Sequence, residues 1–324
     1  MKRFILSVLI TAGILFFLFT QISIRDLYAL LKKVDPLWAS LGIFGYILAI
    51  FFRALRYKWL IHSKRVPLAD LFRISVFYNF SLMILPSKLG EFSYPYFLNK
   101  LWGITMTEGL ASLIASRVYD IFTIFIIFLV GSIGFRGLFE INLVLTALLA
   151  VLLVGGTFSA FFYMGQLLEF FSSVIGKTSR LIGARDSKTF QWVQKKVLEI
   201  AEDFRAIKAR QAYIPVILTS FTAWMAAFWL FYALMRGFGV NASFSKIIFG
   251  TTIAIAANAL PISGLGNWGI LEAGWTAGFL LVGLSKVEAI TTGFGVHIIL
   301  FVSAAVMSLL CWFTLQLPPG GRKQ

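Results

Sequence analysis

The sequence predicts an all-α protein that crosses a membrane several times. Of its 324 residues, 59% are hydrophobic and only 13% are charged, and the mean hydropathy is +0.86. Soluble domains carry about 25% charged residues, so this composition indicates a membrane protein. Long apolar stretches alternate with clusters of Lys and Arg along the chain, as expected for helices that each cross a bilayer.

Six apolar stretches are predicted to span the membrane completely, because each is close to the roughly 20 residues that a helix needs to cross the hydrocarbon. They cover residues 4–20, 37–52, 110–134, 143–164, 213–235 and 293–315. The first follows two basic residues, Lys2 and Arg3, and has no small-residue cleavage site after it. We therefore interpret it as a retained signal anchor.

Two shorter apolar stretches, 71–85 and 247–260, each run into a proline. Helices of this length reach only about 20 Å, against a hydrocarbon core of about 30 Å. With the N-terminus in the cytoplasm, nineteen Lys and Arg residues fall on the cytoplasmic side and seven on the outer side, which supports this orientation. Each short stretch must then enter and leave on one side, and the two sides are opposite.

The predicted fold class is thus a polytopic all-α membrane protein with six full spans and two opposed re-entrant hairpins, up to eight membrane segments. It forms a single integral membrane domain over residues 1–324. A first half, 1–164, and a second half, 213–324, are joined by a polar connection over 165–212. Both termini are predicted to be cytoplasmic.

The two short stretches end in similar sequence motifs, ILPSKLGEF and ALPISGLGNWGILEAG. Proline removes a backbone hydrogen-bond donor and glycine permits positive φ, so both motifs are suited to breaking a helix at membrane depth. Paired interruptions of this kind are typical of an inverted repeat with a substrate site between its halves. The alternative is two ordinary kinked helices without a shared site. The residues at the breaks are Pro86, Gly90 and Glu91 in the first motif and Pro261, Gly264, Gly266 and Glu272 in the second.

Four ionisable residues within these membrane segments form the candidate translocation site. Arg117 and Asp120 lie three apart on one predicted helix and can pair, and Glu91 and Glu272 follow the two breaks. Charges inside a membrane are costly, so they indicate function by default. The alternatives are that the helical pair only fixes packing and that the two glutamates are solvated at the interface.

Basic and aromatic residues gather at the cytoplasmic end of the second span, in FRALRYKWL. Arginine suits phosphate, and tryptophan favours the headgroup level, so Arg53, Arg56 and Trp59 are predicted to recognise an anionic headgroup. Simple anchoring by positive charge is the alternative.

The polar connection contains an amphipathic helix, predicted to lie on the cytoplasmic surface. Its apolar residues recur at helical spacing: Phe190, Val193, Val197, Ile200, Phe204 and Ile207.

Other classes of function find little support in the composition. One cysteine and two histidines are too few for a usual metal centre, and no glycine-rich nucleotide loop occurs, so we expect neither a metal nor another cofactor. The net charge of +15 is concentrated in the loops and is explained by membrane orientation rather than by nucleic acid.

Four motifs in order, FRALRYKWL, LPSKLGEF, SRVYD and LPISGLGNWGILEAG, resemble the transmembrane flippase-like domain of lysylphosphatidylglycerol synthases. The resemblance covers nearly the whole chain and includes members without the attached synthase. It implies a helical bundle in a bacterial or archaeal cytoplasmic membrane that moves an anionic, amino-acylated or carrier lipid between leaflets. The sites named above match the motifs of this family.

Two departures from the family pattern stand out. Ser116 occupies a position that is often acidic in the family, and residues 92–95, FSYP, lack the arginine that commonly follows the first break. Fewer charges at the site put the identity of the headgroup in doubt.

The leading hypothesis is a lipid translocase that is not an enzyme, with membrane lipids and possibly a lipid-modifying enzyme as partners. One alternative is a membrane enzyme that transfers a group to or from a lipid carrier, with Glu91, Asp120 or Glu272 as general base. The other is a non-transporting protein that docks an enzyme through the helix in 165–212.

Overall fold

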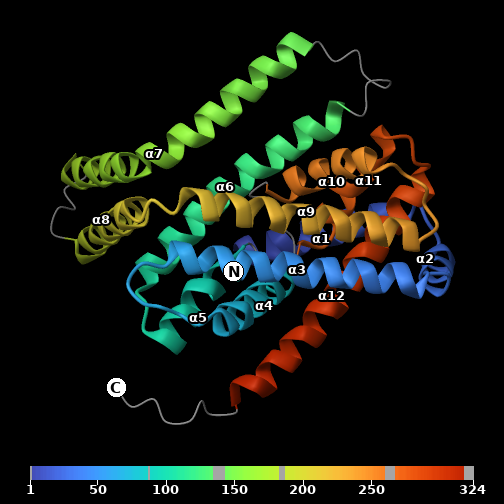
Figure 1. Ribbon diagram of the computed structural model, residues 1–324, viewed down its shortest axis with the longest axis horizontal. Coiled ribbons are helices and arrows are strands. Elements are labelled where there is room, and N and C mark those ends of the chain that lie inside the picture. Colours follow the sequence, from blue (N-terminus) through green and yellow to red (C-terminus); the bar gives the residue numbers. More distant parts are fainter. Residues whose placement is uncertain (1, 87, 134–142, 182–186, 260–266, 317–324) are drawn as a thin grey trace.

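The computed structural model describes residues 2–86, 88–133, 143–181, 187–259 and 267–316, and within these ranges the regular structure is helical and contains no strand (Figure 1). The predicted all-α fold class is therefore confirmed. In chain order the elements are α1 (Lys2–Phe19), α2 (Ile24–Lys32), α3 (Pro36–Leu60), α4 (Leu68–Ile84), the 3-10 helix η1 (Leu89–Phe92), α5 (Ser93–Trp102), α6 (Met106–Ile133), α7 (Leu143–Leu181), α8 (Lys188–Ala209), α9 (Tyr213–Gly237), α10 (Phe244–Ala259), α11 (Ile270–Leu281) and α12 (Lys286–Gln316).

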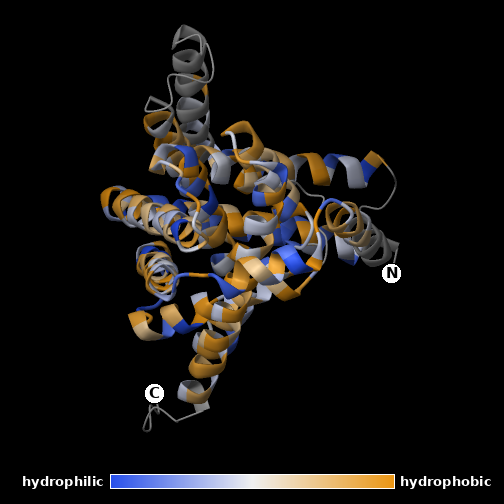
Figure 2. Ribbon diagram, turned by 90° about the vertical axis from the view of Figure 1, so that its right-hand side faces the viewer, coloured by the Kyte–Doolittle hydropathy of each residue, from blue (hydrophilic) through white to orange (hydrophobic). Residues whose placement is uncertain are grey.

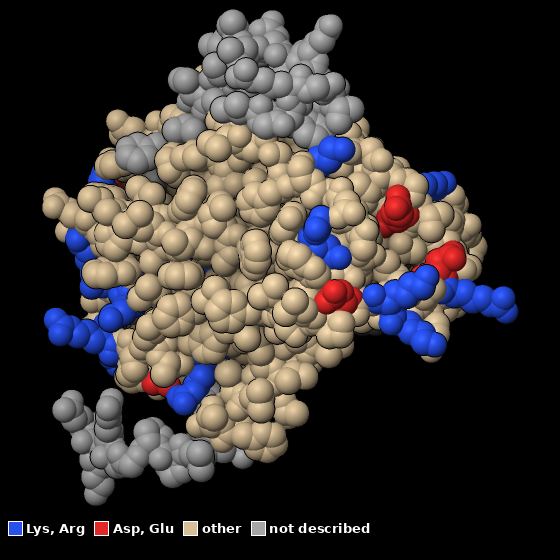
Figure 3. Space-filling model, turned by 45° about the vertical axis from the view of Figure 1, so that its right-hand side comes forward, with Lys and Arg blue, Asp and Glu red and all other residues tan. Residues whose placement is uncertain are grey.

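Four of the predicted spans appear as helices that are long and apolar enough to cross a membrane. They are Pro36–Leu60, Met106–Gly131, Tyr213–Gly237 and Lys286–Thr314. Hydrophobic residues predominate along many of the helices (Figure 2), and large apolar side chains such as Phe16, Phe44 and Leu310 are exposed. On the face drawn in Figure 3 a broad uncharged area separates the Lys, Arg, Asp and Glu side chains. Apolar side chains on the outside are suited to contact with lipid.

The first predicted span differs from expectation because the chain turns sharply after it. Thr11–Phe19 and Ile24–Lys32 form an angle of 82° and together make one broken span or a re-entrant loop. The turn is fixed by a capping box: the Ser23 hydroxyl accepts from the Asp26 amide at 3.2 Å, and the Asp26 carboxylate accepts from the Ser23 amide at 2.9 Å. The chain thus starts a new helix where a straight anchor was expected to end.

The fourth predicted span, 143–164, lies within α7, which continues as one helix to Leu181. Many of its side chains before residue 162 lie outside the described residues. The predicted amphipathic helix is α8, which buries Ala201, Phe204 and Ile207 and packs against α6 and α7. Its apolar face is therefore covered by protein.

The same succession of helices occurs twice in the chain. A long helix, a short helix that ends at a break, a second short helix and another long helix form the set α3, α4, α5 and α6, and again the set α9, α10, α11 and α12. The first set begins at residues 36, 68, 93 and 106, and the second at 213, 244, 270 and 286, which is 176 to 180 residues later in each case.

Packing between the two sets is reciprocal. The first helices of the sets, α3 and α9, lie along each other (Figure 1), while the short helix α4 packs on α12 and its counterpart α10 packs on α6. Small residues permit the close approach of α3 and α9, since a Cβ at Gly45 would lie 3.1 Å from the carbonyl oxygen of Ala226. Each set therefore supplies a surface that the other covers.

Glycine also permits the two arms of each hairpin to pack closely. A Cβ at Gly90 in η1 would lie 2.6 Å from the Ser81 carbonyl oxygen of α4, and a Cβ at Gly274 in α11 would lie 2.6 Å from the Ala257 Cβ of α10. No larger residue fits at either contact without moving the backbone. The two arms of each hairpin pack directly against each other for this reason.

Candidate functional site

The first break places Glu91 next to α6. After α4 ends, Lys88 adopts a left-handed conformation with φ of 62°, and η1 turns the chain toward α5. Gly90 is buried against α4, so the neighbouring Glu91 is held at the junction between the hairpin and α6. Of the predicted break residues, Pro86 and Gly90 lie at this turn.

Arg117 of α6 meets Glu91 at this junction. Its Nη2 donates to Glu91 Oε1 at 3.3 Å and to the Tyr78 hydroxyl of α4 at 2.6 Å. The side chains of Arg117 and Glu91 are 43% and 32% exposed. This ion pair joins two predicted site residues and remains accessible from outside the protein.

Asp120 lies within ion-pair distance of the predicted Arg117, but its hydrogen bonds from arginine come from Arg56. Its Oδ1 accepts from Arg56 Nη1 at 2.6 Å, whereas the closest Arg117 nitrogen is 3.9 Å from Oδ2 and makes no hydrogen bond. The side chains of Arg56 and Asp120 are 1% and 8% exposed. Arg56, which was predicted to recognise a headgroup, is buried where this face of α3 packs against α6 and α9.

Neighbouring groups add hydrogen bonds to the Arg56–Asp120 pair, although Arg56 Nε has no hydrogen-bond partner among the described residues. Ser220 accepts from Arg56 at 3.0 Å, and the Trp224 indole donates to Asp120 at 2.7 Å. Ser116 also accepts from Arg56. A serine hydroxyl thus accepts from Arg56 at the position where the resemblance leads one to expect an acid.

Arg53 extends the charged cluster on the α3 side. Its Nη1 lies 3.4 Å from Asn79 Oδ1, its guanidinium carbon lies 5.2 Å from the centre of the Trp224 ring, and its Nε has no hydrogen-bond partner among the described residues. Three arginines and two carboxylates here leave a formal charge of +1. Trp59, the third residue predicted at the headgroup level, is 37% exposed and lies about one turn after Arg56 on α3.

The second hairpin buries its glutamate. Glu272 Oε1 lies 2.6 Å from His297 Nδ1, and Oε2 accepts from the Gly269 amide at 2.7 Å. Both side chains are at most 1% exposed, and Trp268 stacks on the His297 ring with centroids 3.9 Å apart. Glu272 therefore caps α11 and ties it to α12.

His297 was given no role from the sequence, although a signal was present. Glu272 and His297 are separated by 25 residues, and Glu91 and Arg117 by 26. With Glu91 aligned on Glu272, His297 falls one residue before the position equivalent to Arg117.

The first break contacts the C-terminal end of α10. Lys88 Nζ at the first break donates to the carbonyl oxygen of Asn258, near the end of α10, at 2.5 Å. Pro261, Gly264 and Gly266 of the second break lie outside the described residues. Within the described part of the chain, no group of three or more His, Cys, Asp or Glu side chains is arranged to hold a metal ion.

Comparison with known proteins gives one match. A family model described as the lysylphosphatidylglycerol synthase TM region matches residues 4–307, which is nearly the whole chain. No curated protein and no solved structure matches the sequence.

Proposed function

The chain belongs to the family of the lysylphosphatidylglycerol synthase transmembrane region, and from this premise we propose that it moves a lipid between the leaflets of the membrane. The lipid headgroup contacts the Glu91–Arg117 pair, while the acyl chains stay in the bilayer. The substrate class is an anionic, amino-acylated or carrier lipid.

The observation that carries this proposal is the half-exposed pair of opposite charges beside a broken helix. An ion pair in or near the membrane that served only packing would be expected in the protein interior, as the Arg56–Asp120 pair is. Arginine binds phosphate through its planar fork, and a carboxylate binds an ammonium group. A phospholipid that carries an amino acid offers both groups, so it could replace each partner of the pair by one of its own charges.

Reciprocal packing of the two helix sets supports the predicted inverted repeat. In such transporters, the substrate site lies between the repeats, and broken helices supply backbone groups to it. Here α4 rests on α12 and α10 rests on α6, so a shift of one set against the other moves both breaks together. We propose that this shift opens the Glu91–Arg117 site to one leaflet and then to the other.

The cell membrane of a bacterium or archaeon is the proposed location, with the N-terminus in the cytoplasm. The excess of Lys and Arg on that side supports the orientation. A lipid-modifying enzyme that supplies the transported lipid is the proposed partner.

Leaflet exchange in proteoliposomes tests the function. Headgroup-labelled phosphatidylglycerol and lysylphosphatidylglycerol are compared for the wild type, Arg117→Gln and Glu91→Gln at matched reconstitution. We expect Arg117→Gln to slow the exchange of both lipids by about tenfold or more, because a charge-assisted contact to phosphate is lost. Glu91→Gln is expected to slow only the lysylated lipid.

A matched control is available in the Asp70–Arg73 pair, whose side chains are 23% and 30% exposed and whose closest atoms are 2.7 Å apart. Arg73→Gln removes the same charge from a comparable ion pair and should leave exchange unchanged. Absence of exchange by the folded wild type, or equal exchange by wild type and Arg117→Gln, would count against the proposal.

A further inference from the structure

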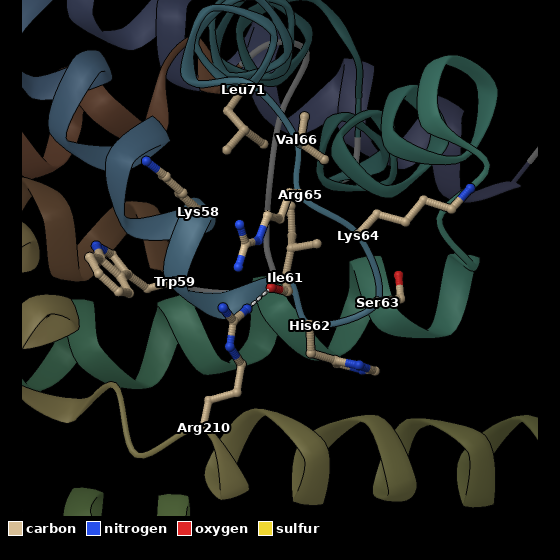
Figure 4. Close-up of a pocket in the computed structure, with 10 residues that line it drawn as sticks. All are labelled: Lys58, Trp59, Ile61, His62, Ser63, Lys64, Arg65, Val66, Leu71 and Arg210. Atoms are coloured by element: carbon tan, nitrogen blue, oxygen red, sulfur yellow. Dashed lines mark hydrogen bonds between the residues drawn. The ribbon is translucent and has the colours of Figure 1, made fainter. Parts of the chain in front are cut away.

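We propose that a basic pocket at the Leu60 end of α3 binds a multiply charged phosphate group, either a phosphomonoester or a diphosphate. The pocket is a cavity of about 670 Å³ between the α3–α4 connection and the start of α9. Its lining includes Lys58, Trp59, Lys64, Arg65 and Arg210 (Figure 4). It is separate from the Glu91–Arg117 pair, and binding there does not depend on lipid transport.

Positive charge in this pocket is not balanced by the protein. The lining contains no Asp or Glu. Among the described residues, no carboxylate forms an ion pair with Lys58, Arg65 or Arg210. Like charges around one cavity repel each other, and a bound anion removes that repulsion.

The nearest carboxylates are engaged in holding the α3–α4 connection. Glu108 of α6 is 1% exposed and accepts from the amides of His62 and Ser63 at 2.7 and 2.8 Å. Asp203 of α8 lies 3.1 Å from Nε2 of the His62 ring. These contacts fix the backbone that carries the basic residues and leave the bases themselves without carboxylate partners among the described residues.

Two of the basic side chains, Arg65 and Arg210, converge in the pocket. Arg210 donates to the carbonyl oxygen of Ile61, which holds its guanidinium group at the wall of the pocket. In Figure 4 the guanidinium groups of Arg65 and Arg210 point toward each other, while the side chains of Lys58 and Trp59, which also line the pocket, extend away from them to one side. Lys64 points away and donates to the Trp102 carbonyl at 2.8 Å. Three cationic groups thus remain for a ligand.

The charge of the pocket selects the class of ligand. A phosphodiester carries one negative charge, whereas a phosphomonoester carries about 1.5 to 2 at neutral pH. Three unpaired cations match the second kind of group better, and two arginine forks provide paired donors for its oxygens. The cavity is also within the range of about 300 to 1,000 Å³ that ligand pockets usually have. A lipid headgroup and a soluble phosphate compound share this chemistry.

Binding of two probes to the full-length protein in detergent tests the proposal. Inorganic pyrophosphate is titrated by calorimetry, and phosphatidate is counted on the protein by native mass spectrometry, with phosphatidylglycerol as the singly charged reference. The variant is Lys58→Gln with Arg65→Gln, since neither side chain has a described hydrogen bond to lose. The control is Lys188→Gln with Lys195→Gln, two exposed bases of α8 whose loss changes the net charge equally.

We expect the pocket variant to bind its ligand at least about tenfold more weakly than the wild type, and the control to change by less than about twofold. Binding of pyrophosphate alone identifies a soluble source, binding of phosphatidate alone identifies a lipid, and binding of both identifies the phosphate group itself. Equal affinities in variant and control, no binding of either probe, or phosphatidylglycerol binding as tightly as phosphatidate would overturn the proposal. Exchange through the Glu91–Arg117 site is measured separately and is expected to persist in the pocket variant.

Discussion

The two hairpins carry a glutamate at equivalent places, yet one carboxylate is accessible and the other is buried. Glu91 is 32% exposed and pairs with a half-exposed arginine, whereas Glu272 is completely buried and pairs with a buried histidine. Both glutamates follow a break and reach the long helix that comes next. The same succession of helices thus supports an accessible ion pair in one half and an interior contact in the other.

Burial determines what each pair can contribute. An exposed ion pair contributes about 0 to 1 kcal/mol to stability, so Glu91 and Arg117 can exchange partners at little cost. Breaking a buried pair costs about 3 to 5 kcal/mol, because the remaining group has no water to replace its partner. We infer that the first hairpin serves ligand contact and that Glu272, which the sequence placed in the translocation site, fixes the second hairpin.

The largest effect is expected from Glu272→Ala. This change leaves His297 without its partner and the Gly269 amide without its acceptor, so the free energy of unfolding should fall by about 3 to 5 kcal/mol. Unfolding in mixed micelles measures it. Glu91→Ala is the matched change in the first hairpin and should cost less than about 1 kcal/mol. Equal losses in the two variants would contradict the assignment of different roles.

The next effect concerns the glycine contacts that close the second hairpin. Gly278→Ala introduces a methyl group against the backbone of Gly250, and the α10–α11 pair must separate to admit it. We expect a loss of about 1 to 3 kcal/mol in the free energy of unfolding. Gly155→Ala in α7 is the control, since a Cβ there meets nothing within 4 Å. If Gly278→Ala is as stable as the control, the hairpin does not need this contact.

A smaller effect is expected from Tyr78→Phe in the first hairpin. The Tyr78 hydroxyl accepts from Arg117 at 2.6 Å and so orients the guanidinium group. Loss of one such bond costs about 1 kcal/mol, which corresponds to roughly a fivefold slower lipid exchange. Trp268→Leu removes the ring stacked on His297 and should instead lower stability while the folded fraction retains its exchange rate. A Tyr78→Phe variant that loses stability but keeps its exchange rate would contradict the assignment of ligand contact to the first hairpin.

Much of the fold follows from local sequence. The four long apolar helices are runs of apolar residues whose length alone predicts a membrane helix. The break at Pro86 and Gly90 follows from the chemistry of those residues. The turn at Ser23 was missed, although Ser23 and Asp26 have the spacing of a capping box, because the apolar stretch before them matched a signal anchor.

Partners at the site depended on packing that the sequence does not reveal. Arg117 and Asp120 are neighbours on one helix, so their pairing was the local expectation. Asp120 instead bonds Arg56, 64 residues away, because α3 and α6 bring the two side chains together in the interior. The buried contact of Glu272 with His297 likewise depends on how α11 meets α12, and neither residue type nor local spacing specifies it.

The smallest effect is expected where the two hairpins meet. Lys88 Nζ at the first break donates to the carbonyl oxygen of Asn258 in α10, the first arm of the second hairpin. Lys88→Met keeps a long unbranched side chain but removes the donor, so the free energy of unfolding should fall by about 0.5 to 1.5 kcal/mol.

Lys88→Arg keeps a cationic donor and serves as the control for this last change. Hydrogen exchange of the amides near the end of α10 gives a local readout, because a lost contact between the first break and α10 should speed exchange there while α8, which is remote from this contact, keeps its protection. The accessible and the buried hairpin then behave as one coupled unit. Unchanged protection in α10 after Lys88→Met would mean that each hairpin is held by its own half of the protein alone.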